Sequence, residues 1–332
     1  MILAETPSGV LTTNKKAMSK EDVFEQVKTT ILEGIEKKGL DWFKPWTSST
    51  YKVGDEWRPI NRVSGRAYSG TNIWILSAAM VQCGYEHNEW GTYKNIQDLG
   101  GNVRKGEKAF DTYHWNIGFW NPTTKKTFKS MAEAIAKGES MSDIKQFFSL
   151  KIWKVFNIGQ CENIEPRNPH APIEEPTEDD FSPIDIAEAA IKNWAHCPKI
   201  NHGGNRAYYS PMADYVQMPE PTDFIDGDSY YKTLFHELVH STGHKARLNR
   251  KPVADSAFKF GDADYSVEEL VAESGSMMAV GILGLNPKDS NANSQAYINN
   301  WLKGVRETPA KAIVSALTHS SKAIEYMFES QS

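Results

Sequence analysis

The chain has 332 residues, of which 40% are hydrophobic and 24% charged, as is usual for a globular protein. No apolar run reaches the roughly 18 residues of a membrane span, and three scattered cysteines exclude a disulfide framework and fit a reducing compartment. The net charge of −5 is uneven, because residues 1–165 carry 22 Lys and Arg against 19 Asp and Glu, and residues 166–332 carry 15 against 23.

The first half of the chain predicts a small mixed domain. Residues 1–18 lack the apolar segment of a signal peptide and are expected to form a disordered leader. Helical spacing behind an N-cap at Ser19 predicts a helix that ends at Gly39. Further elements are expected in this order: helices over 70–82 and 95–99, a strand over 108–119, a surface insertion over 123–149 that is partly helical around 131–136, and a strand over 150–157.

A segment rich in proline and acidic residues, 166–183, predicts a stiff, solvated linker. It divides the chain into an N-terminal domain, 19–165, and a C-terminal domain, 184–332. The predicted fold class is α+β, with a small first domain and a second domain that is mostly helical and has a short edge-stranded sheet. In the second domain we expect a helix from Ile184, a short strand over 214–218, and four helices over about 228–243, 266–283, 292–305 and 309–328. The strand over 214–218 is expected to be an edge strand that can pair with an extended substrate through its backbone.

The segment HELVH, residues 236–240, is an HExxH motif. Residues four apart on a helix share a face, so His236 and His240 can bind one ion, and Glu237 can act as the general base of a metallopeptidase. Zinc suits this donor set because it accepts imidazole and carboxylate ligands and leaves one position open for water. The alternative is a solvated helix with two exposed histidines. Apolar neighbours of the motif argue against it, because buried histidines need partners.

The third zinc ligand is expected on a later helix. Glu269 and Glu273 share a helix face, which allows Glu269 to bind the ion and Glu273 to accept a hydrogen bond from a ligand histidine. Glu268 and Glu273 remain open as alternative ligands. A carboxylate third ligand is typical of gluzincins.

Three further residues are candidates for supporting roles. The metzincin pattern HExxHxxGxxH is incomplete because Ala246 stands at its last position, so we expect His244 to support the site and not to bind the ion. Tyr265 and His319 can each donate a hydrogen bond to a tetrahedral oxyanion, although a core role is favoured for His319.

The first half contains eight of the ten tryptophans. Lysine and arginine neutralise phosphates and aromatic faces stack on unpaired bases, so single-stranded-DNA binding is one interpretation. Aromatic side chains packed into a core are the other. The segments that combine these residue types hold Arg58, Arg66, Tyr68, Asn72, Trp90, Arg104, Lys105 and Lys108.

Several motifs resemble the ArdC antirestriction family. In the first half they are GRAYSGTN (65–72), WGTY (90–93) and LGGNVRKGEK (99–108). In the second half they include HELVHSTGHKARLNR (236–250) and YSVEELVAE (265–273). The resemblance runs from near residue 20 to the end of the chain, in the family's order, and leaves out the leader and the 123–149 insertion.

The resemblance implies a cytoplasmic protein of a plasmid or phage in a bacterial host, which protects incoming DNA from restriction. It implies a single-stranded-DNA-binding domain beside a zinc metallopeptidase, a layout similar to the Spartan-type proteases of DNA–protein crosslinks. The metal ligands would be His236, His240 and Glu269, with Glu237 as the base. On the DNA side the resemblance points to Arg66, Tyr68, Asn72, Arg104, Lys105 and Lys108.

The expected partners are single-stranded DNA and a protein substrate, for which a DNA-bound protein is one candidate, and no membrane. Two alternatives stay open. One is a DNA-shielding protein whose zinc is structural, and the other is a zinc peptidase without a DNA role. The complete HExxH motif favours an enzyme, because a structural zinc needs no general base and usually has four protein ligands.

Overall fold

The computed structural model describes residues 20–38, 57–167, 183–254, 263–287 and 303–328. The expected leader, most of the expected linker and most of the expected helix over 292–305 lie outside these residues. No described helix is long and apolar enough to cross a membrane.

The N-terminal half is built on one five-stranded sheet. Its strands follow the order β1-β2-β6-β4-β5, with β4 and β6 antiparallel from the Phe110–Val155 pair to the Trp120–Lys145 pair. A second, two-stranded ladder joins β3 to β7. The strands are β1 Ile60–Asn61, β2 Glu89–Thr92, β3 Asn102–Val103, β4 Phe110–Trp120, β5 Thr127–Phe128, β6 Lys145–Asn157 and β7 Cys161–Glu162.

Three helices accompany this sheet: α1 Lys20–Lys38, α2 Thr71–Cys83 and α3 Tyr93–Asp98. Helix α1 buries Val23, Val27 and Ile31, whose spacing of four residues places them on one face. Thr92 caps α3 by accepting a hydrogen bond from the Asn95 amide at 3.2 Å. The three helices agree with the predicted ones to within about two residues at their described ends, the usual uncertainty of helix boundaries.

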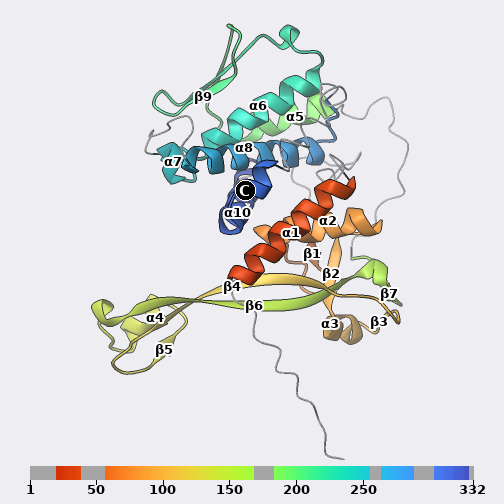
Figure 1. Ribbon diagram of the computed structural model, residues 1–332, viewed down its shortest axis with the longest axis vertical. Helices are drawn as coiled ribbons and strands as arrows, with labels where there is room; N and C mark the ends of the chain where they lie inside the picture. Colours follow the sequence, from red (N-terminus) through yellow and green to blue (C-terminus); the bar gives the residue numbers. More distant parts are fainter. Residues whose placement is uncertain (1–19, 39–56, 168–182, 255–262, 288–302, 329–332) are drawn as a thin grey trace, which may run out of the picture.

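The predicted insertion over 123–149 forms the outer end of the β4–β6 hairpin, which projects from the body as an arm (Figure 1). Its tip holds β5, a helix α4 over Met131–Ala136 and a short 3-10 turn over Met141–Asp143. The Ser130 hydroxyl caps α4 by accepting from the Glu133 amide at 3.0 Å. Strand β6 begins at Lys145, five residues before the predicted strand, because pairing with β4 continues into the arm.

The C-terminal half is mostly helical, as predicted. Its helices are α5 Pro183–Asn193, α6 Gly227–Thr242, α7 Lys251–Ala254, α8 Ala263–Ile282 and α10 Ala310–Phe328, with residues 303–307 also helical. Helix α6 carries the HExxH motif. Asp226 caps it by accepting from the Ser229 amide at 2.8 Å, and Leu234, Phe235 and Leu238 are almost wholly buried.

A three-stranded sheet covers α6, in the order β8-β10-β9. The strands are β8 Lys199–His202, β9 Tyr208–Ser210 and β10 Tyr215–Met218. The predicted strand over 214–218 is therefore the central strand of this sheet. The expectation that it is an edge open to substrate is wrong, because β8 pairs with one side of β10 and β9 with the other.

Helix α10 joins the two halves of the molecule. Figure 1 shows it between α8 on one side and α1 and α2 on the other. The Trp74 indole of α2 donates to the Leu317 carbonyl at 3.2 Å and to the Ser321 hydroxyl at 3.0 Å. Trp74 is 1% exposed, so these bonds are made in the core and fix α2 against α10.

Candidate metal centre

His236, His240 and Glu269 converge on one point between α6 and α8. Their ligand atoms all lie within 4.8 Å of one another. The Nε2 atom of His236 is 3.6 Å from Glu269 Oε2, and the Nε2 atom of His240 is 3.5 Å from Glu269 Oε1. Two imidazoles and a carboxylate are the donor set of a catalytic zinc site, so these residues fit a divalent metal ion.

The other nitrogen of each imidazole faces a carboxylate from α8. His236 Nδ1 lies 3.2 Å from Glu273 Oε2, and His240 Nδ1 lies 3.3 Å from Glu268 Oε1. A carboxylate only accepts hydrogen bonds, so each Nδ1 carries a proton and each Nε2 faces the centre, where it can bind an ion. The contact of Glu273 with a histidine was expected from its spacing, whereas that of Glu268 was not.

Arg250 completes this arrangement and is absent from the sequence-based predictions. Its guanidinium forms two hydrogen bonds with the Glu268 carboxylate, at 3.0 and 2.6 Å. It also donates to the Val239 carbonyl at 2.8 Å and to the Thr242 hydroxyl at 2.6 Å. The side chains of Arg250 and Glu268 are 3% and 2% exposed, so a buried ion pair ties α8 to the end of α6.

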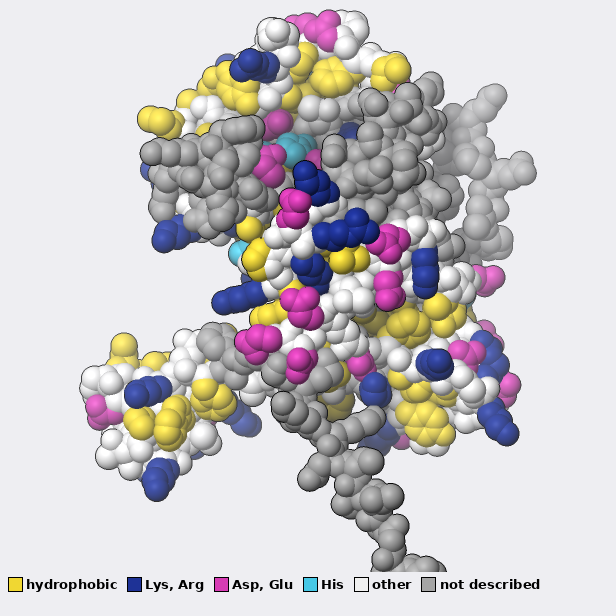
Figure 2. Space-filling model, viewed as in Figure 1, with side chains coloured by type: hydrophobic (Ala, Val, Ile, Leu, Met, Phe, Trp, Pro, Cys, Tyr) yellow, Lys and Arg dark blue, Asp and Glu magenta, His cyan; other side chains and the backbone are white. Residues whose placement is uncertain are grey.

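The charges of this cluster favour a cation at its centre. Burial lowers the pKa of His236, but the carboxylates of Glu269 and Glu273 outweigh burial and raise it to about 10. Burial raises the pKa of Glu269, but hydrogen bonds with His236 and His240 outweigh burial and lower it. In Figure 2 a histidine lies beside acidic side chains in the upper part of the molecule.

Glu237 lies on α6 directly after the first histidine and is 8% exposed. Its Oε2 atom accepts a hydrogen bond of 2.8 Å from the backbone amide of Tyr209 on β9. Among the described residues β9 is an edge strand, and this amide points away from β10 toward the carboxylate. The edge strand beside the candidate base is therefore β9.

A second buried cluster fixes β9 in this place. Arg247 donates to the Ser241 carbonyl at 2.7 Å, to the Tyr209 hydroxyl at 3.1 Å and to Asp214. Burial raises the pKa of Asp214, but hydrogen bonds from Arg247 and Tyr209 outweigh burial and lower it. This cluster holds the turn between β9 and β10 against the end of α6.

The remaining candidates near the centre lie in different surroundings. His244 lies 3.8 Å from Asp214 and accepts from the Ala246 amide at 3.2 Å, so it belongs to the Arg247 cluster and not to the three ligands. His319 lies on α10, where burial and then the positive charge of Arg250 lower its pKa. Tyr265 lies in the first turn of α8, and its side chain falls outside the described residues.

Two residues of the predicted DNA-binding set, Trp90 and Asn72, make contacts within the fold. The Trp90 ring is 0% exposed and packs against Leu76 and Val155, so neither of its faces is open to a base. Asn72 exchanges two hydrogen bonds of 2.8 Å with the Tyr113 backbone. The prediction for Trp90 is corrected because its side chain fills the core, whereas Asn72 attaches α2 to β4 and its role in DNA binding stays a prediction.

The other candidates vary in exposure. Arg66, Lys105 and Lys108 are exposed, whereas Tyr68 is half-buried. Burial raises the pKa of Tyr68. Arg104 is also exposed, although its guanidinium donates to backbone carbonyls, among them that of Cys161 at 3.3 Å.

Arg58, the last of the DNA-binding candidates, forms an ion pair of 3.5 Å with Glu325 on α10. Trp153 on β6 was not predicted, yet its side chain is 52% exposed and lies between the exposed residues Lys151 and Lys154. Alternation along the strand, with a lysine two residues away on the same face, is a signal that could have identified it.

Comparison with known proteins agrees with the division of the chain into two parts. Residues 21–156 match the family described as the N-terminal domain of anti-restriction factor ArdC, and residues 187–319 match the family described as zincin-like metallopeptidase. Together the fold and the site define a two-domain protein that joins an ArdC-type N-terminal domain to a zincin-like metallopeptidase domain.

The chain is 30% identical to the antirestriction protein ArdC of plasmid R388, whose metal-free crystal structure it matches with a TM-score of 0.63 over 93% of this chain and 97% of that one. The Mn(II)-bound structure of the same protein matches with a TM-score of 0.62. The uncharacterized protein y4eC of Sinorhizobium fredii is 31% identical over 326 residues, which is 97% of this chain and 96% of that protein. The chain belongs to the ArdC family of antirestriction proteins, as its motifs predicted.

A further relative is longer. The DNA primase TraC of Escherichia coli is 30% identical over 301 residues, which is 90% of this chain but 26% of TraC. This similarity therefore concerns one part of that protein.

Proposed function

We propose that the C-terminal domain is a zinc-dependent peptidase, with the ion held by His236, His240 and Glu269. The observation that carries this proposal is the convergence of these three ligands beside Glu237, with both Nδ1 atoms held by carboxylates. A structural zinc site usually has four protein ligands and needs no general base. Three ligands and an adjacent carboxylate therefore favour catalysis.

Glu237 is the general base in this proposal. When bound, the ion polarises the substrate carbonyl and makes a water molecule more acidic. Glu237 removes a proton from that water as it attacks the carbonyl carbon, and later returns the proton to the leaving amine. The Tyr209 amide, 2.8 Å from Glu237, orients the carboxylate before substrate binds.

Supporting roles follow from the contacts of the neighbouring side chains. Glu268 and Glu273 orient the two ligand histidines, and Arg250 holds Glu268 in place. His319, kept neutral by burial and by Arg250, and Tyr265 remain candidate donors to the oxyanion. His244 and Arg247 support the β9–β10 turn.

Peptidase activity is tested with fluorescein-labelled casein as the probe, in the presence and absence of single-stranded DNA. Glu237→Gln keeps the shape of the side chain and is expected to abolish cleavage while zinc content stays at that of the wild type. Glu307→Gln, at an exposed position in the same half, is the control and is expected to cleave normally. Cleavage retained by Glu237→Gln would remove this residue from the mechanism.

We further propose that the N-terminal domain binds single-stranded DNA, and that the protein acts in the cytoplasm of a bacterial host, where it protects incoming plasmid or phage DNA. Support comes from exposed cations, Arg66, Lys105 and Lys108, and from the exposed aromatic ring of Trp153. Cations neutralise phosphates and an open ring stacks on an unpaired base. The match to an ArdC N-terminal domain agrees with this proposal.

DNA binding is measured by fluorescence anisotropy of a labelled 20-mer of oligo(dT) with the full-length protein, using a duplex as control and a salt series. Preference for the single strand and a steep loss of affinity with salt are the expected result. If no binding is found at low salt, the DNA half of the proposal is wrong.

A DNA-shielding protein with a structural zinc remains the second candidate. It is favoured only if casein and DNA-bound proteins are left intact while single-stranded DNA is bound tightly.

A further inference from the structure

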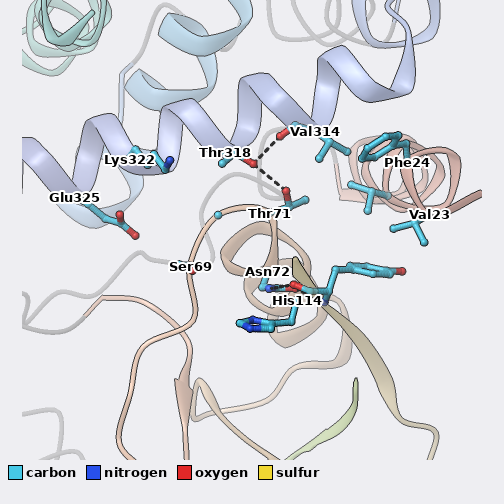
Figure 3. Close-up of a pocket in the computed structure, with 13 residues that line it drawn as sticks. Val23, Phe24, Ser69, Thr71, Asn72, His114, Val314, Thr318, Lys322 and Glu325 are labelled. Atoms are coloured by element: carbon cyan, nitrogen blue, oxygen red, sulfur yellow. Dashed lines mark hydrogen bonds between the residues drawn. The ribbon is translucent and has the colours of Figure 1, made fainter. Parts of the chain in front are cut away.

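A cavity of about 260 Å³ lies where the two domains meet. Figure 3 shows that α1 and α10 line one part of it and that the turn before α2 and strand β4 line the other. Its apolar wall consists of Val23, Phe24 and Val27 from α1 and Val314 from α10.

The polar wall of this cavity carries positive charge. Lys322 of α10 is exposed, and among the described residues it forms no ion pair. His114 of β4 also lines the cavity and is exposed. The carboxylate of Glu325 is the acidic group of the lining, and its charge is offset by Arg58 at 3.5 Å.

The cavity has a fixed shape. The Thr71 and Thr318 hydroxyls are hydrogen-bonded to each other at 3.1 Å, and Asn72 is bonded twice to the Tyr113 backbone at 2.8 Å. Gly70 lies between these contacts with a φ of +59°, a conformation that glycine adopts without strain. A site held in this way loses little conformational freedom when a ligand enters.

A row of side chains connects the cavity with the exposed face of the sheet. His114 is paired directly with Lys151 of β6, so the two side chains project from the same face of the sheet. Trp153 is two residues further along β6 and shares that face. The row therefore leads from Lys322 past His114 and Lys151 to the open aromatic ring of Trp153.

We propose that this cavity, the interdomain pocket, receives one nucleotide of the single-stranded DNA that crosses the N-terminal domain. Its phosphate binds Lys322 and His114, and its base packs against Phe24 and Val314. The chain of the DNA then continues over Lys151 to stack on Trp153. The inference rests on the proposed DNA binding and adds that α10 of the peptidase domain forms part of the DNA site.

The size of the pocket favours a single strand. Its volume of about 260 Å³ is close to the lower limit of small-molecule pockets, about 300 Å³, and leaves no room for paired bases. A duplex placed on the same face would leave the pocket empty.

The inference is tested by anisotropy with the 20-mer of oligo(dT) and the full-length protein. Lys322→Ala removes one phosphate contact, and the slope of log K against log salt should fall in magnitude by about 0.7. Val314→Trp fills the pocket and should weaken binding by about tenfold, because the base loses its packing surface. Lys311→Ala, which removes an exposed charge from the same helix, is the control and should leave the slope unchanged. Thermal unfolding of each variant confirms that it is folded.

The outcomes separate this inference from the proposed function. If the wild type does not bind the oligonucleotide, both are wrong. If the wild type binds and both Lys322→Ala and Val314→Trp bind equally well, DNA binding stands and the pocket is refuted. Equal losses for Lys322→Ala and Lys311→Ala would show a general effect of charge, and would also refute the pocket.

Discussion

Replacement of Arg250 by methionine tests whether the buried ion pair with Glu268 supports the metal centre. Methionine keeps most of the side-chain length and removes the charge, which leaves a carboxylate 2% exposed without its partner. Breaking one partner of a buried pair costs about 3–5 kcal/mol. Burial then favours protonation of Glu268, which weakens its hold on His240. Loss of a residue that orients a metal ligand lowers metal affinity by about 10- to 100-fold.

Two measurements on the full-length protein separate the effects of this change. Urea unfolding gives the loss of stability, and competition with a chromophoric chelator gives the zinc affinity. Arg247→Met is the matched control, since Arg247 is also buried but pairs with Asp214 and touches no metal ligand. It should lower stability and leave zinc affinity unchanged. The reasoning is refuted if Arg250→Met binds zinc as tightly as the wild type.

Four further predictions follow from the same geometry. Glu269→Gln should lower zinc occupancy, as measured by metal analysis after dialysis, and full occupancy would show that Glu269 is not a ligand. Chelation of the metal by EDTA should lower the Tm, and added zinc should restore it, because an ion that binds the native state stabilises it. In the metal-free protein the pKa of His236 is raised to about 10, so its contribution to stability is complete below about pH 6.5 and is lost as the pH rises toward 10. The urea concentration at the unfolding midpoint should therefore fall as the pH rises over this window, and His236→Gln should make that midpoint less dependent on pH. Trp153→Ala should weaken oligonucleotide binding by about 1–3 kcal/mol with little change in stability, whereas Trp90→Ala should destabilise the fold by about 3–5 kcal/mol.

The sequence predicted the parts of the metal centre that depend on the spacing within one helix. His236 and His240 are one turn apart on α6, and Glu269 and Glu273 are one turn apart on α8, so each pair shares a face whatever the rest of the fold does. Glu268 lies about 100° around the helix from Glu269, and the sequence left it open as an alternative ligand without predicting its contact with His240. It reaches His240 because α8 packs closely along α6.

Arg250 and Tyr209 could not be predicted in this way, because their contacts depend on how the chain turns. Arg250 returns to the end of α6 after the bend that begins at Gly243, where an added Cβ would lie 3.0 Å from the Arg250 guanidinium. Tyr209 meets Glu237 only because β9 folds back against β10. Spacing along the chain therefore predicts neither the contact of Arg250 with α6 nor that of Tyr209 with Glu237.

In the N-terminal domain, counting aromatic residues could not separate core from surface. Trp90 and Trp153 both lie on strands beside polar residues, yet one is 0% and the other 52% exposed. The difference arises from neighbours distant in sequence, since Leu76 and Ala79 of α2 cover Trp90. The strand predicted over 108–119 is confirmed by β4, but a strand prediction does not indicate which face of the sheet a helix will cover.

The position of α10 determines how the two domains can influence each other. This helix packs along α8, which carries Glu268, Glu269 and Glu273, and it is hydrogen-bonded to Trp74 of α2 in the core. A ligand in the interdomain pocket would therefore contact the helix that supports the metal centre. Coupling between two binding sites is reciprocal, so any factor by which DNA changes zinc affinity must equal the factor by which zinc changes DNA affinity. Titrating the oligonucleotide into zinc-loaded and chelator-treated protein measures this factor. Equal DNA affinities for the zinc-loaded and chelator-treated protein would mean that α10 does not couple the two sites.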